Sequence, residues 1–437
     1  MSDQQPTVAI LTLGCKLNQA DSEAIARRLR GSGVLVLDRP RAGVDAFVIN
    51  TCSVTHVADR KARHLARLAR RLSPGAQVIL TGCYVERAPA EAAQTGADLV
   101  LGSREKPTIP DWLLERLRQR GDPAAGCDAP VREGLRTRAL VKIQEGCNEL
   151  CSFCIVPYTR GCEHSVPIAQ VVEEVIARQA EGVLEVVLTG TQLGNYGRDF
   201  ARQEPGPRRL LEALLERTSV SRIRLSSLQA QDVSGQLLAL WQDPRLCPHF
   251  HLPLQSGSDA VLCRMRRRYT AQQFRGVVEM IREHVPNASI TTDVIAGFPG
   301  ETEEDVEATY RLCQEISFAA IHAFPYSRRP GTAAALLPSH IPPPVKRSRL
   351  ERLLELGRAS AETFRRGFLG RTLAVLWEEE KGGHWQGLTG NYIRVYTSAG
   401  DALANRLIPT RLTAMADGGV VGVLEPVSHL GHERREP

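Results

Sequence analysis

Three cysteines lie close together in the segment QEGCNELCSFCIVPYTRG, at Cys147, Cys151 and Cys154. Thiolates bind soft metals and iron–sulfur clusters. A loop with these gaps can supply three ligands to a [4Fe–4S] cluster and leave the fourth iron free for a substrate or cofactor, as in a catalytic site. A zinc loop is the alternative, because Cys162 or His164 could act as a fourth ligand.

Three further cysteines, Cys15, Cys52 and Cys83, each follow a predicted strand directly, in LTLGC, VINTC and ILTGC. They are 37 and 31 residues apart, and each interval suits one β/α unit. The carboxyl ends of neighbouring parallel strands meet at one edge of a sheet. We therefore expect the three thiols to lie together and to hold a second cluster. The alternative is three unrelated buried cysteines.

The N-terminal region, from residue 7 to about 110, must position this second set. Apolar and polar segments alternate along it, which predicts a parallel sheet with crossover helices. The predicted strands are 7–14, 45–51 and 77–82, and the predicted helices are 22–33 and 58–72. Segment 118–134 is rich in Gly, Pro and charged residues and is typical of a linker.

The central region, from about 135 to 365, must position the first set. It contains six predicted strands with helical patterns between them, which favours a curled, partly open barrel over a closed eightfold one. The three-cysteine loop follows the first strand, where ligands gather in such folds. The strands are ALVKIQE, EVVLTG, RIRLSS, HFHLPL, SITTDVIAGF and AAIHAFPYS.

The last region alternates apolar and polar residues and carries Gly-rich turns, which predicts a small five-stranded β-barrel. An amphipathic helix, 345–366, precedes it. The predicted fold class is therefore α/β with three domains. These are an N-terminal parallel α/β domain at 7–115, a central partial (β/α)6 barrel at 133–365 and a C-terminal all-β barrel at 368–432.

Composition narrows the function classes. Apolar residues make up 43% of the chain, but no run of about 18 of them occurs, so we expect no membrane span. The N-terminus lacks the features of a signal peptide, so we expect a cytoplasmic protein. The net charge of +6 permits a nucleic-acid partner without requiring one. In a reducing compartment the 11 cysteines are metal ligands or buried residues rather than disulfides.

The C-x3-C-x2-C loop, with Phe153 before its last cysteine, resembles the signature of the radical S-adenosylmethionine (SAM) superfamily. The resemblance implies a [4Fe–4S] cluster whose open iron binds the amino and carboxylate groups of SAM. It also implies a reductant such as flavodoxin or ferredoxin, and cleavage of SAM to methionine and a 5′-deoxyadenosyl radical. The cofactor carries this chemistry, while the protein positions and shields it.

Two three-cysteine sites on two domains resemble the methylthiotransferase family over nearly the whole chain. TLGCKLNQADSE, NTCSVTHVADRKAR and TGCY are similar to its N-terminal domain, and the C-terminal module is similar to its TRAM domain, an RNA-binding barrel. The family inserts a methylthio group at an unactivated C–H bond. The resemblance implies that one SAM supplies the methyl group, another supplies the radical, and the auxiliary [4Fe–4S] cluster carries the sulfur.

The motifs GCKLNQ, NTCSVTHVADRKAR and KIQEGCN resemble most the branch that modifies C2 of N6-threonylcarbamoyladenosine at position 37 of tRNA. The other branches act on isopentenyladenosine in tRNA or on an aspartate of a ribosomal protein. An alternative from another functional class is an iron–sulfur protein that binds RNA or transfers electrons and does not cleave SAM.

Resemblance to the superfamily also implies SAM contacts after three of the barrel strands. Ordinary strand-end turns and hydroxyls bonded to backbone are the alternatives. His251 and Gln255 lie near the pocket mouth by position, although a lone histidine is more often a satisfied core residue. The expected contacts are Gly190 and Gln192 for the amino group, Ser226 and Ser227 for the ribose or methionyl part, and Asp293 and Gly297 for adenine.

Two positions depart from the family pattern. Gln229 stands where the family usually carries Glu, and Val166 stands where an Arg commonly follows the RG-x-x-x-S turn. If those groups bind SAM charges elsewhere, this chain must use neutral donors or a shifted network. The cluster ligands are not affected.

The predicted helix 58–72 is strongly basic and suits a nucleic acid. Arg60, Lys61 and Arg63 could contact phosphates, and Arg371 and Arg394 add positive charge to the C-terminal module. The alternative for the helix is an ordinary solvated face. A tRNA partner is therefore expected from the resemblance, and the basic residues are consistent with it.

Overall fold

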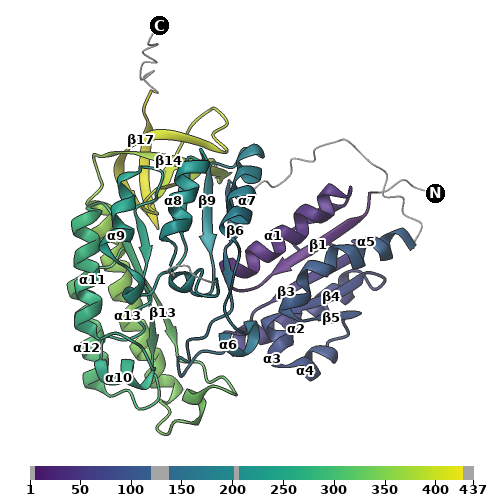
Figure 1. Cartoon of the computed structure of the whole chain (residues 1–437), viewed down its shortest axis with the longest axis horizontal. Helices are drawn as coiled ribbons and strands as arrows, with labels where there is room; N and C mark the ends of the chain where they lie inside the picture. The colour runs from purple at the N-terminus through teal and green to yellow at the C-terminus, as the bar shows by residue number, and fades with distance from the viewer. Residues whose placement is uncertain (1–4, 120–136, 201–205, 427–437) are drawn as a thin grey trace.

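The computed structural model of the chain describes residues 5–119, 137–200 and 206–426. Figure 1 shows three parts. A purple sheet with its helices lies beside a teal and green barrel, and a small yellow barrel lies at one end of that central barrel. Most of the predicted linker, 118–134, lies outside the described residues.

The N-terminal part is a five-stranded parallel sheet in the order β2-β1-β3-β4-β5. The prediction of a parallel sheet is confirmed, but the sequence patterns missed the two edge strands, which have three residues each. Helix α1 begins at Lys16, six residues before its predicted start at Ser22. The strands are β1 (Thr7–Thr12), β2 (Leu35–Leu37), β3 (Ala46–Thr51), β4 (Gln77–Gly82) and β5 (Leu99–Leu101).

Helices cover both faces of this sheet, as a buried parallel sheet requires. Every residue of β3 is buried, and two separate apolar clusters form on the two faces. Helix α2 buries Ala62, Ala66 and Ala69 and leaves most of its basic residues outside. The helices are α1 (Lys16–Gly31), α2 (His56–Leu72), α3 (Cys83–Arg87), α4 (Pro89–Ala93), η1 (Ser103–Thr108) and α5 (Ile109–Gln119).

The central part contains two three-stranded parallel sheets, β10-β9-β6 and β11-β12-β13. A single bridge, Ile223 to Leu246, joins them, and one continuous apolar core fills the interior. Six parallel strands in a curved, open arrangement confirm the predicted partial barrel. The strands are β6 (Arg138–Lys142), β9 (Glu185–Thr189), β10 (Arg222–Leu225), β11 (His249–His251), β12 (Ser289–Ala296) and β13 (Ala320–Pro325).

Helices lie on the outside of these strands (Figure 1). The last of them, α13 (Pro343–Arg366), packs along β13 at the open edge. Among the described helices, none combines the length and the apolar character that crossing a membrane requires. The other principal helices are α7 (Ile168–Ala180), α8 (Arg208–Arg217), α11 (Ala271–His284) and α12 (Glu303–Ile316).

The C-terminal part is a closed five-stranded barrel around the buried Trp377. The alternating segment 387–397 forms parts of two strands, separated by a turn in which Tyr392 has φ 68°. The predicted domain boundary at 115 falls inside α5, and those at 133 and 432 lie outside the described residues. The strands are β14 (Thr372–Lys381), β15 (His384–Thr389), β16 (Arg394–Thr397), β17 (Arg406–Ala416) and β18 (Gly419–Leu424).

Candidate iron–sulfur and SAM sites

Cys147, Cys151 and Cys154 lie in the loop that joins β7 (Gln144–Glu145) to α6 (Val156–Arg160), just after the first barrel strand. All three are half-buried free thiols. The structure therefore presents three thiols from one continuous loop, as the spacing predicts.

The base of this loop is closed by backbone contacts. The Cys147 N–H donates to the Gly161 carbonyl at 3.1 Å. Gly146 has φ +77°, and a Cβ added there would lie 1.9 Å from the Cys162 carbonyl oxygen. Only glycine fits, because the left-handed backbone and the close approach both exclude a side chain. The two ends of the segment are therefore held together.

The surroundings of these sulfurs suit metal-bound thiolates. The Glu149 N–H lies 3.4 Å from the Cys147 sulfur, and Arg267 Nη1 lies 3.4 Å from the Cys151 sulfur. Burial raises the pKa of Cys147 to about 12 and that of Cys154 to about 11. Such thiols lose their protons when a metal binds, so the donors and the cation fit an iron–sulfur cluster.

The second set is assembled from three separate strand ends. Cys15, Cys52 and Cys83 follow β1, β3 and β4, which are neighbours in the sheet and end in register. Cys52 and Cys83 are buried, while Cys15 is exposed. Burial is the main cause that raises the pKa of Cys52 to about 11, and the charges of Cys83 and Cys15 add to it. These mutual effects place the three thiols together, and their role as cluster ligands stays a prediction.

Gly14 makes this convergence possible. It has φ +99°, and a Cβ added there would lie 2.5 Å from Cys52 Cβ and 2.8 Å from its sulfur. The strand end that carries Cys15 therefore packs directly against Cys52. A side chain at position 14 would separate the two.

The zinc alternative needs a fourth ligand beside the loop. Within the described residues, no three Cys, His, Asp or Glu side chains, the two cysteine sets included, gather around a point suited to a single metal ion. Cys162 is exposed, and His164 is engaged elsewhere, with Nδ1 3.6 Å from Asp199 Oδ2. The case for clusters rests on the two sets of three thiols and on the cations beside them.

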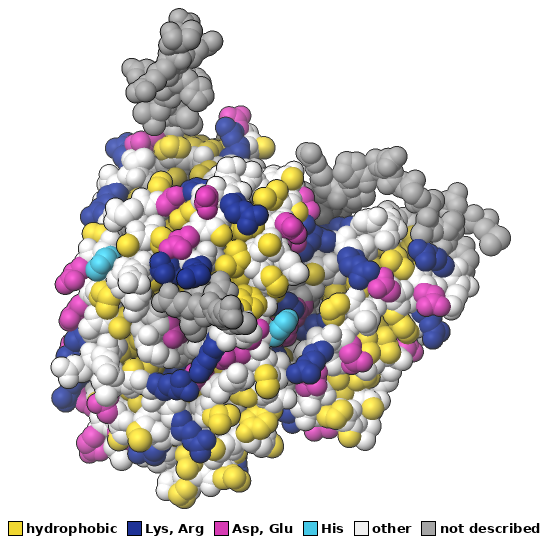
Figure 2. Space-filling model, in the orientation of Figure 1, with side chains coloured by type: hydrophobic (Ala, Val, Ile, Leu, Met, Phe, Trp, Pro, Cys, Tyr) yellow, Lys and Arg dark blue, Asp and Glu magenta, His cyan; other side chains and the backbone are white. Residues whose placement is uncertain are grey.

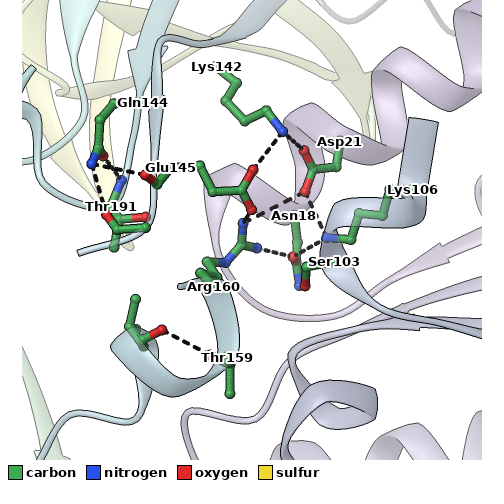
Figure 3. Close-up of polar contacts among 12 residues, drawn as sticks. Asn18, Asp21, Ser103, Lys106, Lys142, Gln144, Glu145, Thr159, Arg160 and Thr191 are labelled. Carbon is green, nitrogen blue, oxygen red and sulfur yellow. Dashed lines mark hydrogen bonds and ion pairs between the residues drawn. The ribbon is translucent and has the colours of Figure 1, made fainter. Parts of the chain in front are cut away.

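Arg160 links the central barrel to the N-terminal part through Glu145 and Asn18 (Figure 3). Its Nη1 lies 2.5 Å from Glu145 Oε1, and its Nη2 lies 2.5 Å from Asn18 Oδ1. Burial alone would lower the pKa of Arg160, but the charges of Cys83, Glu145 and Cys15 raise it. Arg160, the last residue of α6, therefore follows the Cys147–Cys154 loop in sequence. In the folded chain it lies beside the auxiliary cysteines.

Asp21 is the buried centre of the same network (Figure 3). Its Oδ2 lies 2.7 Å from Lys106 Nζ, and its Oδ1 lies 2.6 Å from Lys142 Nζ. Desolvation would raise the pKa of Asp21, but Lys106, Lys142 and Arg160 together lower it. A cleft of about 450 Å³ runs beside the network, and none of the six cysteines lines it. The network holds the N-terminal sheet against the barrel.

A second buried contact anchors the turn that carries Cys52. Arg329, from the loop after β13, donates to Ser53 Oγ at 2.8 Å and to Asp59 Oδ2 at 2.7 Å. The Arg329 and Asp59 side chains are 3% and 5% exposed. Asp59 Oδ2 also lies 3.2 Å from Arg87 Nη2, so the buried carboxylate pairs with two arginines, and the Arg329 contact fixes the turn on the barrel.

Buried polar atoms mark the carboxyl ends of β9 and β10. Gln144 Oε1 accepts the N–H groups of Thr191 and Gln192, each at 2.9 Å, which shapes the turn that begins at Gly190. Thr191 Oγ1, Gln192 Nε2 and Ser226 Oγ are buried and have no partner in the structure. Unsatisfied buried polar atoms are rare. These three therefore fit a polar ligand, as the predicted SAM contacts at Gly190, Gln192 and Ser226 require.

Asp293 lies in β12 with its carboxylate 3.3 Å from His251 Nε2. His251 Nδ1 lies 2.9 Å from Thr291 Oγ1, so both ring nitrogens are engaged. Gln255 has φ 66° and pairs through its backbone with the same strand. Ser227 is half-buried at the end of β10. Asp293 and His251 thus form one pair at the carboxyl ends of the strands.

Gly297 has a structural explanation. Its N–H donates to Glu301 Oε2 at 2.8 Å, and a Cβ added there would lie 2.1 Å from Lys346 Cγ. The missing side chain makes room for α13. A contact between Gly297 and adenine stays a prediction.

The two departures from the family pattern have clear surroundings. Gln229 Oε1 accepts from Arg267 Nη2, and Arg267 also contacts the Cys151 sulfur. The neutral amide of Gln229 therefore orients the Arg267 guanidinium toward the loop that carries Cys151. Val166 packs against the barrel core, and its N–H donates to the Ile143 carbonyl at 2.8 Å.

The predicted RNA contacts on α2 divide into two kinds. Arg60 and Lys61 are exposed. Arg63 is paired, with Nη1 3.2 Å from Glu91 Oε2. Arg60 and Lys61 are therefore the members of this group whose charges are best placed for phosphates.

The two predicted barrel contacts already have partners. Arg371 Nη1 lies 2.9 Å from Asn287 Oδ1, and Arg394 Nη1 lies 3.2 Å from Gln386 Oε1. On the face in Figure 2, basic and acidic side chains are mixed rather than gathered into one patch. A role of Arg371 and Arg394 in RNA binding stays a prediction.

Comparison with known proteins identifies the family. Residues 141–313 match the Radical SAM superfamily, and residues 7–102 match the Uncharacterized protein family UPF0004. The chain is 35% identical to the threonylcarbamoyladenosine tRNA methylthiotransferase MtaB of Bacillus subtilis, over 93% of each chain. The chain belongs to the radical SAM methylthiotransferases. Enzymes of this family use [4Fe–4S] clusters and SAM.

Two further comparisons describe the range of this methylthiotransferase's relatives. It is 36% identical to the tRNA-2-methylthio-N(6)-dimethylallyladenosine synthase of Thermobifida fusca, over 87% of this chain and 79% of that protein. In structure it resembles the radical SAM methyltransferase TsrM of Kitasatospora setae, with a TM-score of 0.54 and 15% identity over 76% of this chain and 77% of that one. The TsrM comparison supports the fold alone.

Sequence reasoning missed several residues of this methylthiotransferase's sites. Gln144 and Arg160 lie at either end of the segment that carries the first cysteines, so their polarity beside those ligands was an available signal. Arg267 comes from the loop before α11, 116 residues after Cys151, and no local pattern links the two. Only the folded barrel brings them together.

Proposed function

We propose that this chain adds a methylthio group to C2 of N6-threonylcarbamoyladenosine at position 37 of tRNA. The observation that carries the proposal is the end-to-end match with the threonylcarbamoyladenosine methylthiotransferases. This chain covers 93%, 86% and 96% of three such proteins, at 35–37% identity. The three-cysteine sites and the polar atoms at the strand ends supply the chemistry that such a protein needs.

Dimethylallyladenosine in tRNA is the second candidate substrate. The dimethylallyladenosine synthases are 34–38% identical to this chain, which is as similar as the first group. Coverage favours the first group, because this chain spans 86–96% of those proteins and 71–86% of the dimethylallyladenosine synthases. The threonylcarbamoyl substrate is therefore preferred.

When bound, SAM and the two clusters supply a methyl group, a carbon-centred radical and the sulfur atom. The chain's own residues position and shield them. Gln192 and Ser226 would bind polar groups of SAM, and Arg267 would neutralise charge at the Cys151 thiolate. Arg160 would do the same at the auxiliary cysteines, while the buried ion pairs around Asp21 and Asp59 keep the two domains closed against water.

The partners follow from the same assignment. The exposed Arg60 and Lys61 would contact tRNA phosphates, and the C-terminal barrel would serve as the RNA-binding domain. An external reductant such as flavodoxin or ferredoxin would donate one electron to the cluster held by the Cys147–Cys154 loop. The protein would act in the cytoplasm, where tRNA is modified.

Mass spectrometry of tRNA nucleosides from a deletion strain tests the proposal. We expect loss of the methylthio form of threonylcarbamoyladenosine and its return when the wild-type chain is supplied. Loss of methylthio-dimethylallyladenosine instead would support the second candidate. An unchanged nucleoside profile, with no 5′-deoxyadenosine formed by the reduced protein under anaerobic conditions, would overturn both.

A further inference from the structure

Lys16 occupies an unusual position in the molecule. It directly follows Cys15 and is the first residue of α1, so it belongs to the same strand end as one auxiliary cysteine. Its Nζ lies 5.9 Å from the centre of the Tyr392 ring in the C-terminal barrel. Lys16 therefore stands at the corner where the N-terminal sheet, the central barrel and the C-terminal barrel meet.

Three cations surround the same ring, but their pairing differs. Arg224 lies 4.2 Å from the ring centre and bonds Glu185 at 2.8 Å. Arg138 lies 5.7 Å from the ring centre and bonds Glu378 at 2.8 Å. These two guanidinium groups are thus already neutralised by carboxylates.

Lys16 has no such neutralising partner. Among the described residues, the carboxylate of Glu185 also acts on Lys16, but it forms its ion pair with Arg224, and the Lys16 side chain is half-buried. A partly desolvated ammonium without a counter-ion is costly, and an anionic ligand would offset that cost. The corner is therefore arranged to receive one negative charge.

The neighbouring histidines place this charge beside the barrel interior. His249, the first residue of β11, has its ring centre 4.6 Å from that of Tyr392, and His251, two residues later, is paired with Asp293. Lys16, on the same Tyr392 ring, therefore lies beside the residues of β11 that lead to the His251–Asp293 pair.

The proposed substrate has the matching chemistry. The threonyl group on N6 ends in a carboxylate, whereas a dimethylallyl group is uncharged. In adenine, C2 and C6 flank N1, so C2 and the N6 substituent share one edge of the base. A base whose C2 faces the Cys15 site would therefore direct its N6 arm along the same side of the pocket, where Lys16 stands next to Cys15.

We propose that Lys16 binds the carboxylate of the threonylcarbamoyl group and selects this substrate over bases with uncharged N6 groups. The inference rests on the proposed function. Tyr392 packs against the ammonium at the corner, while Arg138 and Arg224 engage Glu378 and Glu185, so neither carboxylate pairs with Lys16. A charge-assisted bond of this kind accounts for roughly a 10- to 100-fold preference.

The test compares two RNAs on one preparation of holoenzyme. Both are anticodon stem-loops with threonylcarbamoyladenosine at position 37, and in one the carboxylate is a methyl ester. For wild type we expect kcat/KM, and binding measured by fluorescence anisotropy, to favour the acid by roughly 10- to 100-fold. Lys16→Met should reduce that ratio to about one, and Lys16→Arg should retain most of it.

Each ratio is independent of how much active enzyme a preparation contains, because both RNAs meet the same protein. A variant that loads its clusters poorly is still scored by the anisotropy ratio. If Lys16→Met keeps the wild-type preference for the acid, or if wild type shows none, the inference is wrong. If wild type methylthiolates neither RNA, the proposed function fails instead.

Discussion

The two cysteine sites of this methylthiotransferase are built in opposite ways. Cys147, Cys151 and Cys154 come from one loop, and their spacing alone places them together. Cys15, Cys52 and Cys83 come from three strands and meet only because those strands are neighbours that end in register. One site is encoded by local spacing, and the other is encoded by sheet topology.

This difference affects how each site fails. The loop site depends on its own backbone and on Arg267, which reaches it from the same barrel. The auxiliary site depends on the packing of Gly14 against Cys52 and on Arg160 from the neighbouring domain. Changes in the domain interface should therefore disturb the auxiliary site first.

Replacing one cysteine in each set gives the largest expected effect. Cys151→Ala should reduce 5′-deoxyadenosine formation to background, because the radical-forming cluster loses a ligand. Cys52→Ala should retain SAM cleavage within about threefold but reduce the methylthiolated product at least about 100-fold. Anaerobic assays with iron analysis check both results, since each variant should hold about half the wild-type iron. Equal loss of SAM cleavage in both would show that the sites do not act separately.

Two glycine variants form the next matched pair. Gly14→Ala would place a Cβ 2.5 Å from Cys52 Cβ, and Gly146→Ala would place one 1.9 Å from the Cys162 carbonyl oxygen. We expect the first to lower only auxiliary iron and the second to lower only the loop cluster, each at a cost of about 1–3 kcal/mol in strain. Mössbauer or EPR spectra of the reconstituted proteins distinguish the two. Loss of both clusters in either variant would contradict the assignment.

The two arginines give a smaller, specific effect. Arg160→Met removes a cation beside Cys83 and Cys15, and Arg267→Met removes one beside Cys151. A nearby positive charge favours the reduced, more negative cluster, so each variant should lower one reduction potential by on the order of 50 mV. Redox titration followed by EPR measures both clusters in one sample. A shift of the wrong cluster would reverse the proposed pairing.

Asp232 gives the smallest expected effect, near the loop site. Burial raises its pKa from the ordinary 3.8 to about 6, so the native state holds this proton more tightly than the unfolded state. The stability contributed by the protonated form is complete below about pH 4 and is lost as the pH rises through 6. Asp232→Asn should therefore raise the free energy of unfolding at pH 8 by about 1 kcal/mol, which is measured as a higher melting temperature. At pH 4.5 the substitution should have little effect. A larger effect at the lower pH would refute this sign.

Much of the fold could be predicted from hydrophobic patterns. The six barrel strands all appear where their sequences suggest, including the three-residue β11 within the longer segment HFHLPL. The edge strands β2 and β5 have only three residues each, too few for a period to show. The predicted start of α1 is too late, and Asp21 and Ser22 are buried within the helix through contacts with Lys106 and Thr12.

The site divides in the same way. The convergence of Cys15, Cys52 and Cys83 could be predicted from the sequence, because the carboxyl ends of neighbouring parallel strands lie at one edge of a sheet. Arg160, Asp21 and Lys106 could not be assembled from sequence, because Arg160 reaches Asp21 across a domain interface and Lys106 lies 85 residues after it in the chain. For Gly297 the sequence suggested a ligand contact, and the structure shows in addition a packing role against Lys346.

The turn at Tyr392 has a consequence for engineering. A tyrosine with φ 68° is strained, and here it is stacked on His249 at 4.6 Å and bonded through its hydroxyl by Arg138 at 3.0 Å. This turn therefore fixes the C-terminal barrel together with other contacts across the junction, such as those of Arg222 with the Leu388 carbonyl and of Asn405 with the Gly182 carbonyl. A chimera that takes its barrel from another RNA-modifying enzyme would need to keep this turn, because a graft lacking it would lose the contacts of Tyr392 with His249 and Arg138.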